Sequence, residues 1–292
     1  MNGKKPIPSS STPPQKARKA QEQQTTEQYA SPQSKGTVIN RRVFLKIVGG
    51  TAAVVAVGAA GATVVKTLTQ DPLEALEAAL AQVLARRYGE TQAKRLAEKI
   101  KHELQSALAQ LPYIGTPEEN KWADNMPSAA LALAAYRALV PDYATLEEVG
   151  QLLYETLQLD LSGATALVMR ATYNEGAIIE KLKALAARSQ RRQYPGDWVM
   201  TFVEGDGKDF SYGVDVTECA IQKYLRAQGA PELTRYLCLT DLVSSETMGR
   251  GLVRYKTLAE GCAVCDFRYK RGRPSYLCPL RDGWPPKFVD RS

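Results

Sequence analysis

The sequence predicts an α+β protein in which an N-terminal helical part is followed by an antiparallel sheet with an inserted helix. Two patterns predict this order. From residue 72 to 193, apolar residues recur every three or four positions, as on one face of a helix. After Pro195-Gly196 the apolar period becomes two, which is typical of strands. A change in composition near residue 40 places a disordered leader and one apolar signal or anchor helix before these parts.

Residues 1–40 form a basic leader that we expect to be disordered. Ser, Thr, Gln, Pro and Lys dominate it, so it cannot bury enough apolar surface to offset the entropy of ordering. The first 46 residues carry nine basic and two acidic side chains, which accounts for the whole net charge of +7. Because the remainder is balanced, the alkaline isoelectric point is no sign of a nucleic-acid partner.

Residues 41–66 read as a twin-arginine signal or a membrane anchor. Arg41 and Arg42 precede the uncharged Ala-, Val- and Gly-rich run 47–65. The expected partner is either the export machinery that reads the arginine pair or the membrane itself, spanned by the apolar run. In both cases the basic flank stays cytoplasmic and the folded domain lies outside the cytoplasm.

The helical part, residues 72–193, contains several start signals. Asp71 followed by Pro72 predicts a capped helix start. Thr145 and Glu148 have the spacing of a capping box. Helices are expected from Pro72, over Thr91–Leu111, over Ser128–Leu139, from Thr145 and over Ser162–Ala187. The helix over Ser128–Leu139 is apolar and should be buried. For the last helix, a break near Gly176 is the alternative.

The sheet-containing part covers residues 197–270. Thr217 is expected to cap the inserted helix. The apolar segment Leu233–Leu242 is ambiguous, and helix is favoured there. The irregular, Pro- and Arg-rich tail 271–292 completes a single domain, 72–292. Strands are expected over Trp198–Glu204, Phe210–Val216, Leu252–Leu258 and Gly261–Tyr269.

One histidine and five cysteines limit the chemistry. Because His102 is the only histidine, a three-histidine zinc site is excluded. All five cysteines follow residue 218, and their odd number leaves at least one thiol outside any disulfide framework. We therefore expect the functional site within Trp198–Lys270, which holds four of them.

Three short motifs in this segment pair a thiol with a carboxylate. They are Glu218-Cys219 at a helix start, Cys238 three residues before Asp241, and Cys265 followed by an aspartate. If Cys219, Cys238 and Cys265 converge with Asp241, they could hold a zinc-like divalent metal. Two alternatives remain open: one cysteine is a catalytic or substrate-sensing thiol, or all are buried structural side chains.

Arg254 and Arg268 fall on predicted neighbouring strands. Two guanidinium groups in this arrangement could bind the carboxylate of a small substrate, because each offers a planar pair of donors. Surface ion pairing is the alternative interpretation.

Several motifs in this order resemble one family. They are Asp-Val-Thr-Glu-Cys at 215–219, Cys-Leu-Thr-Asp at 238–241, Arg-Tyr-Lys-Thr-Leu-Ala-Glu-Gly at 254–261 and Cys-Asp-Phe-Arg at 265–268. The helical stretch Leu131–Tyr154 is similar as well. Together they resemble the L-2-amino-thiazoline-4-carboxylic acid hydrolase family over roughly residues 75–270.

The resemblance implies a hydrolase that opens a cyclic thiazoline amidine to N-carbamoyl-L-cysteine. The reaction needs attack at ring carbon C2, stabilisation of a tetrahedral intermediate and departure of the ring sulfur. We hypothesise that Cys219 or Cys238 is the nucleophile or a metal ligand, with Cys265 as a third candidate thiol. Glu218 or Asp241 would transfer protons, and Arg254 or Arg268 would bind the substrate carboxylate. The alternative hypothesis is a membrane-tethered module that binds a thiolate-held metal or a small ligand without catalysis.

Overall fold

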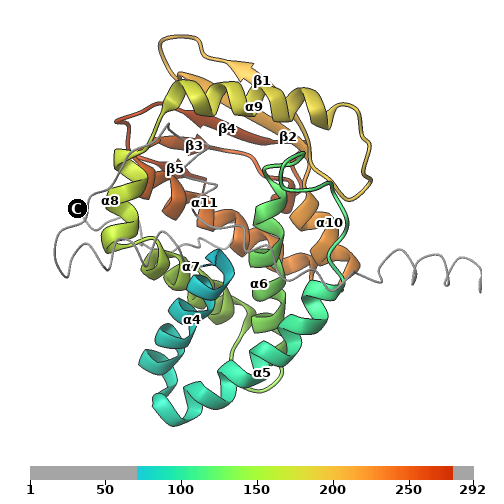
Figure 1. Cartoon of the computed structure of the whole chain (residues 1–292), viewed down its shortest axis with the longest axis vertical. Helices are drawn as coiled ribbons and strands as arrows, with labels where there is room; N and C mark the ends of the chain where they lie inside the picture. Colours follow the sequence, from blue (N-terminus) through green and yellow to red (C-terminus); the bar gives the residue numbers. More distant parts are fainter. Residues whose placement is uncertain (1–70, 279–292) are drawn as a thin grey trace, which may run out of the picture. The chain divides into compact units, whose positions relative to one another are not determined.

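The computed structural model describes residues 71–278, and these form helices followed by a sheet (Figure 1). The predicted α+β order is confirmed. The helical part consists of α4 (Pro72–Tyr88), α5 (Glu90–Ala109), the short 3-10 turn η1 (Ala123–Asn125), α6 (Met126–Leu139), α7 (Leu146–Asp160), α8 (Gly163–Ala171) and α9 (Glu175–Ser189).

Helices α4 and α7 begin at the side-chain caps that the sequence predicts. At the start of α4, the Asp71 side chain accepts a hydrogen bond from the backbone N–H of Leu73 at 2.8 Å. Thr145 and Glu148 form the predicted capping box, since each side chain accepts a hydrogen bond from the other residue's backbone N–H. Gly89, with a φ of 76°, allows α4 to end and α5 to begin with no loop between them.

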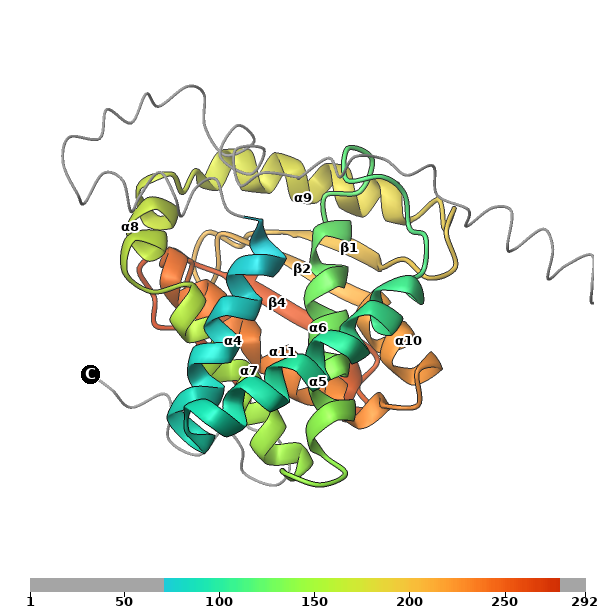
Figure 2. The same ribbon diagram turned by 60° about the horizontal axis from the view of Figure 1, so that its bottom comes forward.

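Helix α6 is the centre of the helical part. Ten of its residues are buried, from Met126 to Leu139, which confirms the predicted buried helix. It contacts α4, α5, α7 and α10, and in Figure 2 α5 lies in front of it while the strands lie behind. Because most of its surface is alanine and leucine, neighbouring helices can approach it closely from several sides.

The segment expected as one helix over Ser162–Ala187 forms two, so the alternative of a break near Gly176 is what occurs. Helix α8 ends at Ala171, and the Asn174 side chain then accepts a hydrogen bond from the Ala177 N–H at 3.0 Å to cap α9. The local cap outweighs continuation of the helical pattern.

The sheet is mixed, where the sequence predicts an antiparallel one. Its strands are β1 (Val199–Glu204), β2 (Tyr212–Glu218), β3 (Leu252–Arg254), β4 (Cys265–Tyr269) and β5 (Tyr276–Leu277), in the order β1-β2-β4-β3-β5. All neighbours are antiparallel except β3 and β5, which are parallel. The expectation fails because part of the tail predicted to be irregular supplies β5.

Two helices lie between β2 and β3, one as the predicted inserted helix and one over the ambiguous segment Leu233–Leu242, for which helix is favoured. They are α10 (Ala220–Ala227) and α11 (Thr234–Met248), separated by the 3-10 turn η2 (Pro231–Leu233). Thr217 does not cap α10, because it stays within β2 and its hydroxyl donates to the Val199 carbonyl oxygen at 3.2 Å. Cys219 is the N-cap residue instead.

The two faces of the sheet have different surroundings. The register pairs Val216 of β2 with Cys265 of β4, and both side chains lie on the face that is buried. Arg254 of β3 lies on the same face. Helix α9 packs against β1, and α11 packs against β3 and β5. The opposite face carries Asp215 and Arg268, neither of which is buried.

The predictions for the leader lie outside residues 71–278 and stay predictions. They concern the disordered segment 1–40 and the twin-arginine signal or anchor at 41–66. Across the part of the chain that the structure describes, the helices are either too short or too polar to cross a membrane.

Candidate active site

Three of the predicted cysteines come from three different elements. Cys219 is the N-cap residue of α10, Cys238 lies within α11, and Cys265 begins β4. Cys265 is buried, and its Sγ accepts a hydrogen bond from the Leu258 N–H at 3.2 Å. Cys219 and Cys238 are half-buried.

An arginine–aspartate pair lies beside these thiols. Arg254 Nη1 donates to Asp241 Oδ2 at 2.5 Å, and its Nη2 donates to the Cys238 carbonyl oxygen at 2.7 Å. The guanidinium also stacks on the Phe267 ring, 4.9 Å from its centre. The Arg254 side chain is 2% exposed and that of Asp241 is 40% exposed. The pair therefore presents a carboxylate toward solvent with a buried cation behind it.

Burial favours the neutral form of all three thiols. It raises the pKa of Cys265 to about 12, raises that of Cys238 well above its usual value, and raises that of Cys219. The charge of Arg254 lowers the pKa of Cys238 and Cys265 without offsetting burial, and Asp241 raises it in all three cysteines. These five groups therefore form one electrostatic neighbourhood.

Cys219 differs from the other two because it stands at a helix start. Burial raises its pKa, but the backbone N–H groups of Ile221 and Gln222 act in the opposite direction. Such donors at a helix N-terminus stabilise negative charge. Of the three thiols, Cys219 has the clearest local support for a thiolate.

The metal site that the sequence offers as one alternative has no preformed ligand set in the described residues. Among residues 71–278, no group of three or more His, Cys, Asp or Glu side chains is arranged to hold a metal ion. Cys219, Cys238 and Cys265 could have been ligands only if their sulfur atoms lay about 2.3 Å from a common point. Instead Cys265 accepts from a backbone amide, and Asp241, the predicted fourth ligand, is bonded to Arg254.

Glu218, the other predicted proton carrier, is engaged elsewhere. It forms ion pairs with Arg192 and, at 2.5 Å, with Lys223. The hydrogen bond from Lys223 and the one from Arg192 lower the pKa of Glu218. Of the two carboxylates that the sequence suggests as proton carriers, Asp241 is therefore the one that acts electrostatically on all three thiols.

Arg254 and Arg268 do lie on neighbouring strands, but they point to opposite faces of the sheet. The register pairs Arg268 with Val253, so Arg254, one residue further along, faces the other way. Arg268 donates to Asp215 at 2.7 Å and stacks on Phe210 at 5.4 Å. The two guanidinium groups therefore cannot bind one carboxylate together.

The buried face holds a second arginine that the sequence reasoning missed. Arg250 lies in the turn between α11 and β3, with its guanidinium 4.8 Å from the centre of the Tyr269 ring. Tyr269 stacks in turn on Tyr212 at 4.9 Å and on Phe267 at 6.4 Å. The available signal was the pair of glycines that flank Arg250, since they mark a tight turn immediately before a strand.

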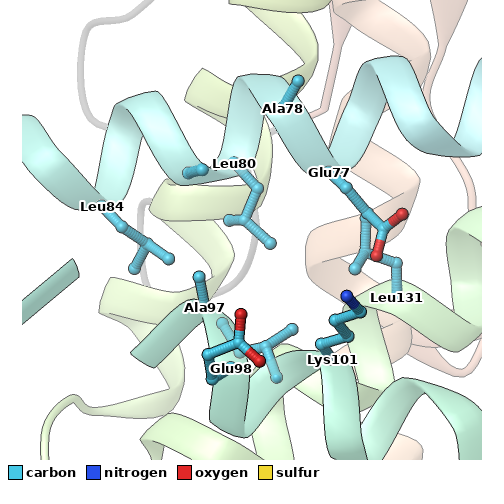
Figure 3. A pocket seen from close by; sticks show the side chains of 10 residues that line it. Glu77, Ala78, Leu80, Leu84, Ala97, Glu98, Lys101 and Leu131 are labelled. Atoms are coloured by element: carbon cyan, nitrogen blue, oxygen red, sulfur yellow. The ribbon is translucent and has the colours of Figure 1, made fainter. Parts of the chain in front are cut away.

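A surface groove of about 300 Å³ lies elsewhere, between α4 and α5. Figure 3 shows Glu77 and Lys101 pointing toward one another across it, among alanine and leucine side chains. None of the cysteines lines this groove, and its only lining residue beyond α4 and α5 is Leu131 of α6. We therefore place the candidate site at the thiols and the Arg254–Asp241 pair.

Comparison with known proteins points to the family that the motifs resemble. The sequence model of the L-2-amino-thiazoline-4-carboxylic acid hydrolase family matches residues 124–269, half of the chain. The match begins later than the predicted residue 75, so α4 and α5 lie outside it, but it contains every predicted site residue. No curated protein and no solved structure matches the chain. The family resemblance is confirmed: this chain belongs to the L-2-amino-thiazoline-4-carboxylic acid hydrolase family.

Proposed function

We propose that this protein hydrolyses a cyclic amidine of the thiazoline type. The observation that carries the proposal is the Asp241–Arg254 pair beside Cys219 and Cys238, within the segment that matches the family. With L-2-amino-thiazoline-4-carboxylate, a water oxygen adds to ring C2, the C2–S bond breaks, and the ring sulfur leaves as a thiolate and takes up a proton. One water is consumed, and the product is N-carbamoyl-L-cysteine.

Asp241 is the proposed general base. Its carboxylate is exposed enough to contact water, and Arg254 holds it in one orientation through a 2.5 Å hydrogen bond. A positioned carboxylate can take the proton of the attacking water and pass it to the leaving sulfur. Arg254 is the positioning residue in this scheme, because its donors are directed at Asp241 and at the Cys238 carbonyl oxygen.

Water is the proposed nucleophile because the raised pKa of each thiol leaves little thiolate at neutral pH. Cys219 is the one thiol for which direct attack deserves a separate test, since helix N–H groups favour its thiolate. The binding-module alternative has less support, because the donors in the described residues are not arranged for a metal.

The full-length protein with L-2-amino-thiazoline-4-carboxylate tests the proposal, with N-carbamoyl-L-cysteine measured by chromatography and mass spectrometry. Asp241→Asn keeps an acceptor for Arg254 but no longer accepts a proton from water, so kcat should fall by about 10²–10⁴-fold. Asp215→Asn is the matched control. It removes the carboxylate that pairs with Arg268 on the opposite face of the sheet, and it should leave kcat unchanged.

Cys219→Ser separates the two nucleophiles. If water attacks, this variant keeps most of its activity; if the thiolate attacks, it loses as much as Asp241→Asn does. A wild-type protein that is folded but forms no product would refute the proposed reaction.

A further inference from the structure

The backbone around Arg250 holds its side chain in place over the sheet. Helix α11 ends at Met248, and Gly249 follows in the left-handed region with a φ of 67°. The Arg250 N–H donates to the Ser245 carbonyl oxygen at 2.9 Å. Gly251 follows with a φ of 63°, and a Cβ on it would lie 2.1 Å from the Lys270 carbonyl oxygen. Because the residues on both sides of Arg250 are glycines with positive φ, the turn is tight. The turn fixes the backbone position from which the Arg250 side chain extends.

The guanidinium of Arg250 is stacked on a ring, and among residues 71–278 it has no acceptor. It lies 4.8 Å from the centre of the Tyr269 ring, and it makes no hydrogen bond or ion pair with any residue in the range 71–278; its buried Nε has no partner. Stacking on a ring leaves the in-plane N–H donors of a guanidinium free, and those donors match the two oxygens of a carboxylate.

The neighbours of Arg250 do not neutralise its charge. Burial raises the pKa of Tyr269 to about 12 and also raises those of Tyr212 and Tyr173, so these phenols are uncharged at neutral pH. Asp241 also acts on Arg250 electrostatically, but its carboxylate is already bonded to Arg254. Asp241 therefore acts on both Arg250 and Arg254, and the nearby Glu175 accepts a hydrogen bond from Tyr173. Arg250 is half-buried, and its Nε is buried without a partner among residues 71–278. Desolvating a cation that has no acceptor is costly, which favours a site completed by an anion from outside.

We propose that Arg250 binds the carboxylate of the substrate, and this inference rests on the proposed function. One unmatched positive charge suits a singly charged carboxylate better than a doubly charged phosphate. The row from Tyr269 to Phe267 leads from Arg250 to Arg254 and its partner Asp241. A small ring held at Arg250 by its carboxylate would lie along these aromatic side chains with its reactive carbon toward the Asp241 carboxylate.

Two substrates and three variants test this assignment. The substrates are L-2-amino-thiazoline-4-carboxylate and 2-amino-2-thiazoline, which lacks the carboxylate. Arg250→Met keeps the apolar contact with Tyr269 but removes the charge. A hydrogen bond to a charged group contributes about 1.5–3 kcal/mol, so KM and Kd for the carboxylated compound should rise roughly 10- to 100-fold. The neutral compound should be unaffected.

Arg250→Lys keeps the charge without the planar pair of donors, so it should lie between wild type and Arg250→Met for the carboxylated compound alone. If Arg250→Met fails to fold by circular dichroism, Arg250→Lys decides the question on the same comparison. Arg170→Met is the control. Its Nε donates to the Thr247 carbonyl oxygen at 2.8 Å, near the same turn, and its loss should change neither KM nor Kd.

Calorimetric binding of the carboxylated compound separates this inference from the proposed hydrolysis. An Arg250→Met variant that binds and turns over the carboxylated compound as wild type does would overturn the assignment of Arg250 while leaving the hydrolysis intact. A wild type that binds it through Arg250 without forming product would refute the hydrolysis and keep the carboxylate site.

Discussion

Truncating the two partners of the Arg254–Asp241 pair should cost unequal amounts of stability, because they are unequally buried. Asp241→Ala leaves a guanidinium that is 2% exposed without its carboxylate. Because water can partly replace a carboxylate that is 40% exposed, the cost should fall at the lower end of the range for buried pairs, about 3–4 kcal/mol. Arg254→Met leaves a carboxylate that is 40% exposed and can be hydrated. It loses the bond to the Cys238 carbonyl oxygen and the stacking on Phe267, together about 2–3 kcal/mol.

Urea unfolding of the full-length variants, followed by circular dichroism and tryptophan fluorescence, measures this difference. The midpoints should shift with little change in the slope of the transition. The double variant, Arg254→Met with Asp241→Ala, should be more stable than Asp241→Ala alone, since no unpaired charge remains buried. If Arg254→Met proves the more destabilising single change, or the double variant is the least stable, the reasoning from burial is wrong.

Two further predictions concern packing and thiol access. Gly150→Ala would place a Cβ 2.2 Å from Tyr236 Cδ1, where α7 packs on α11, so calorimetry should show that the free energy of unfolding falls by about 1–3 kcal/mol. Gly176→Ala lies in the first turn of α9 and makes no contact under 3.6 Å, so it should raise the free energy of unfolding by about 0.5–1 kcal/mol. Similar effects of the two changes would contradict the packing argument. At pH 8, iodoacetamide should modify the exposed Cys278 rapidly. It should modify the buried Cys265 only after unfolding, because burial raises the pKa of that thiol to about 12. Peptide mass spectrometry measures both rates, and equal rates would contradict this prediction.

Local signals in the sequence predicted the helical part well because they act over a few residues. The Asp71 cap and the box formed by Thr145 and Glu148 appear as expected. The same kind of signal explains one failure, since Asn174 caps α9 and divides a segment that apolar spacing favours as a single helix. Thr217 fails for a different reason: its hydroxyl is taken by a neighbouring strand, which no local pattern reveals.

The candidate site was predicted only in part. The sequence predicted which residue types gather in the C-terminal half, and the structure places Cys219, Cys238, Cys265 and Asp241 in one electrostatic neighbourhood. It also shows that the sulfur atoms do not share a metal-binding point. Ligand geometry depends on how a helix start, a helix and a strand dock on each other, and spacing along the chain carries no information about that.

The sequence by itself determined the α+β order, the helix caps at Asp71 and Thr145, the family and the set of residues that could carry the chemistry. These follow from local propensity, from periodicity and from motifs in a fixed order. Only the tertiary structure decided that Arg254 faces the thiols while Arg268 faces away, and that Arg250 lies over Tyr269 without a carboxylate partner among residues 71–278. The physical reason is strand register, because a shift of one residue moves a side chain to the opposite face of a sheet.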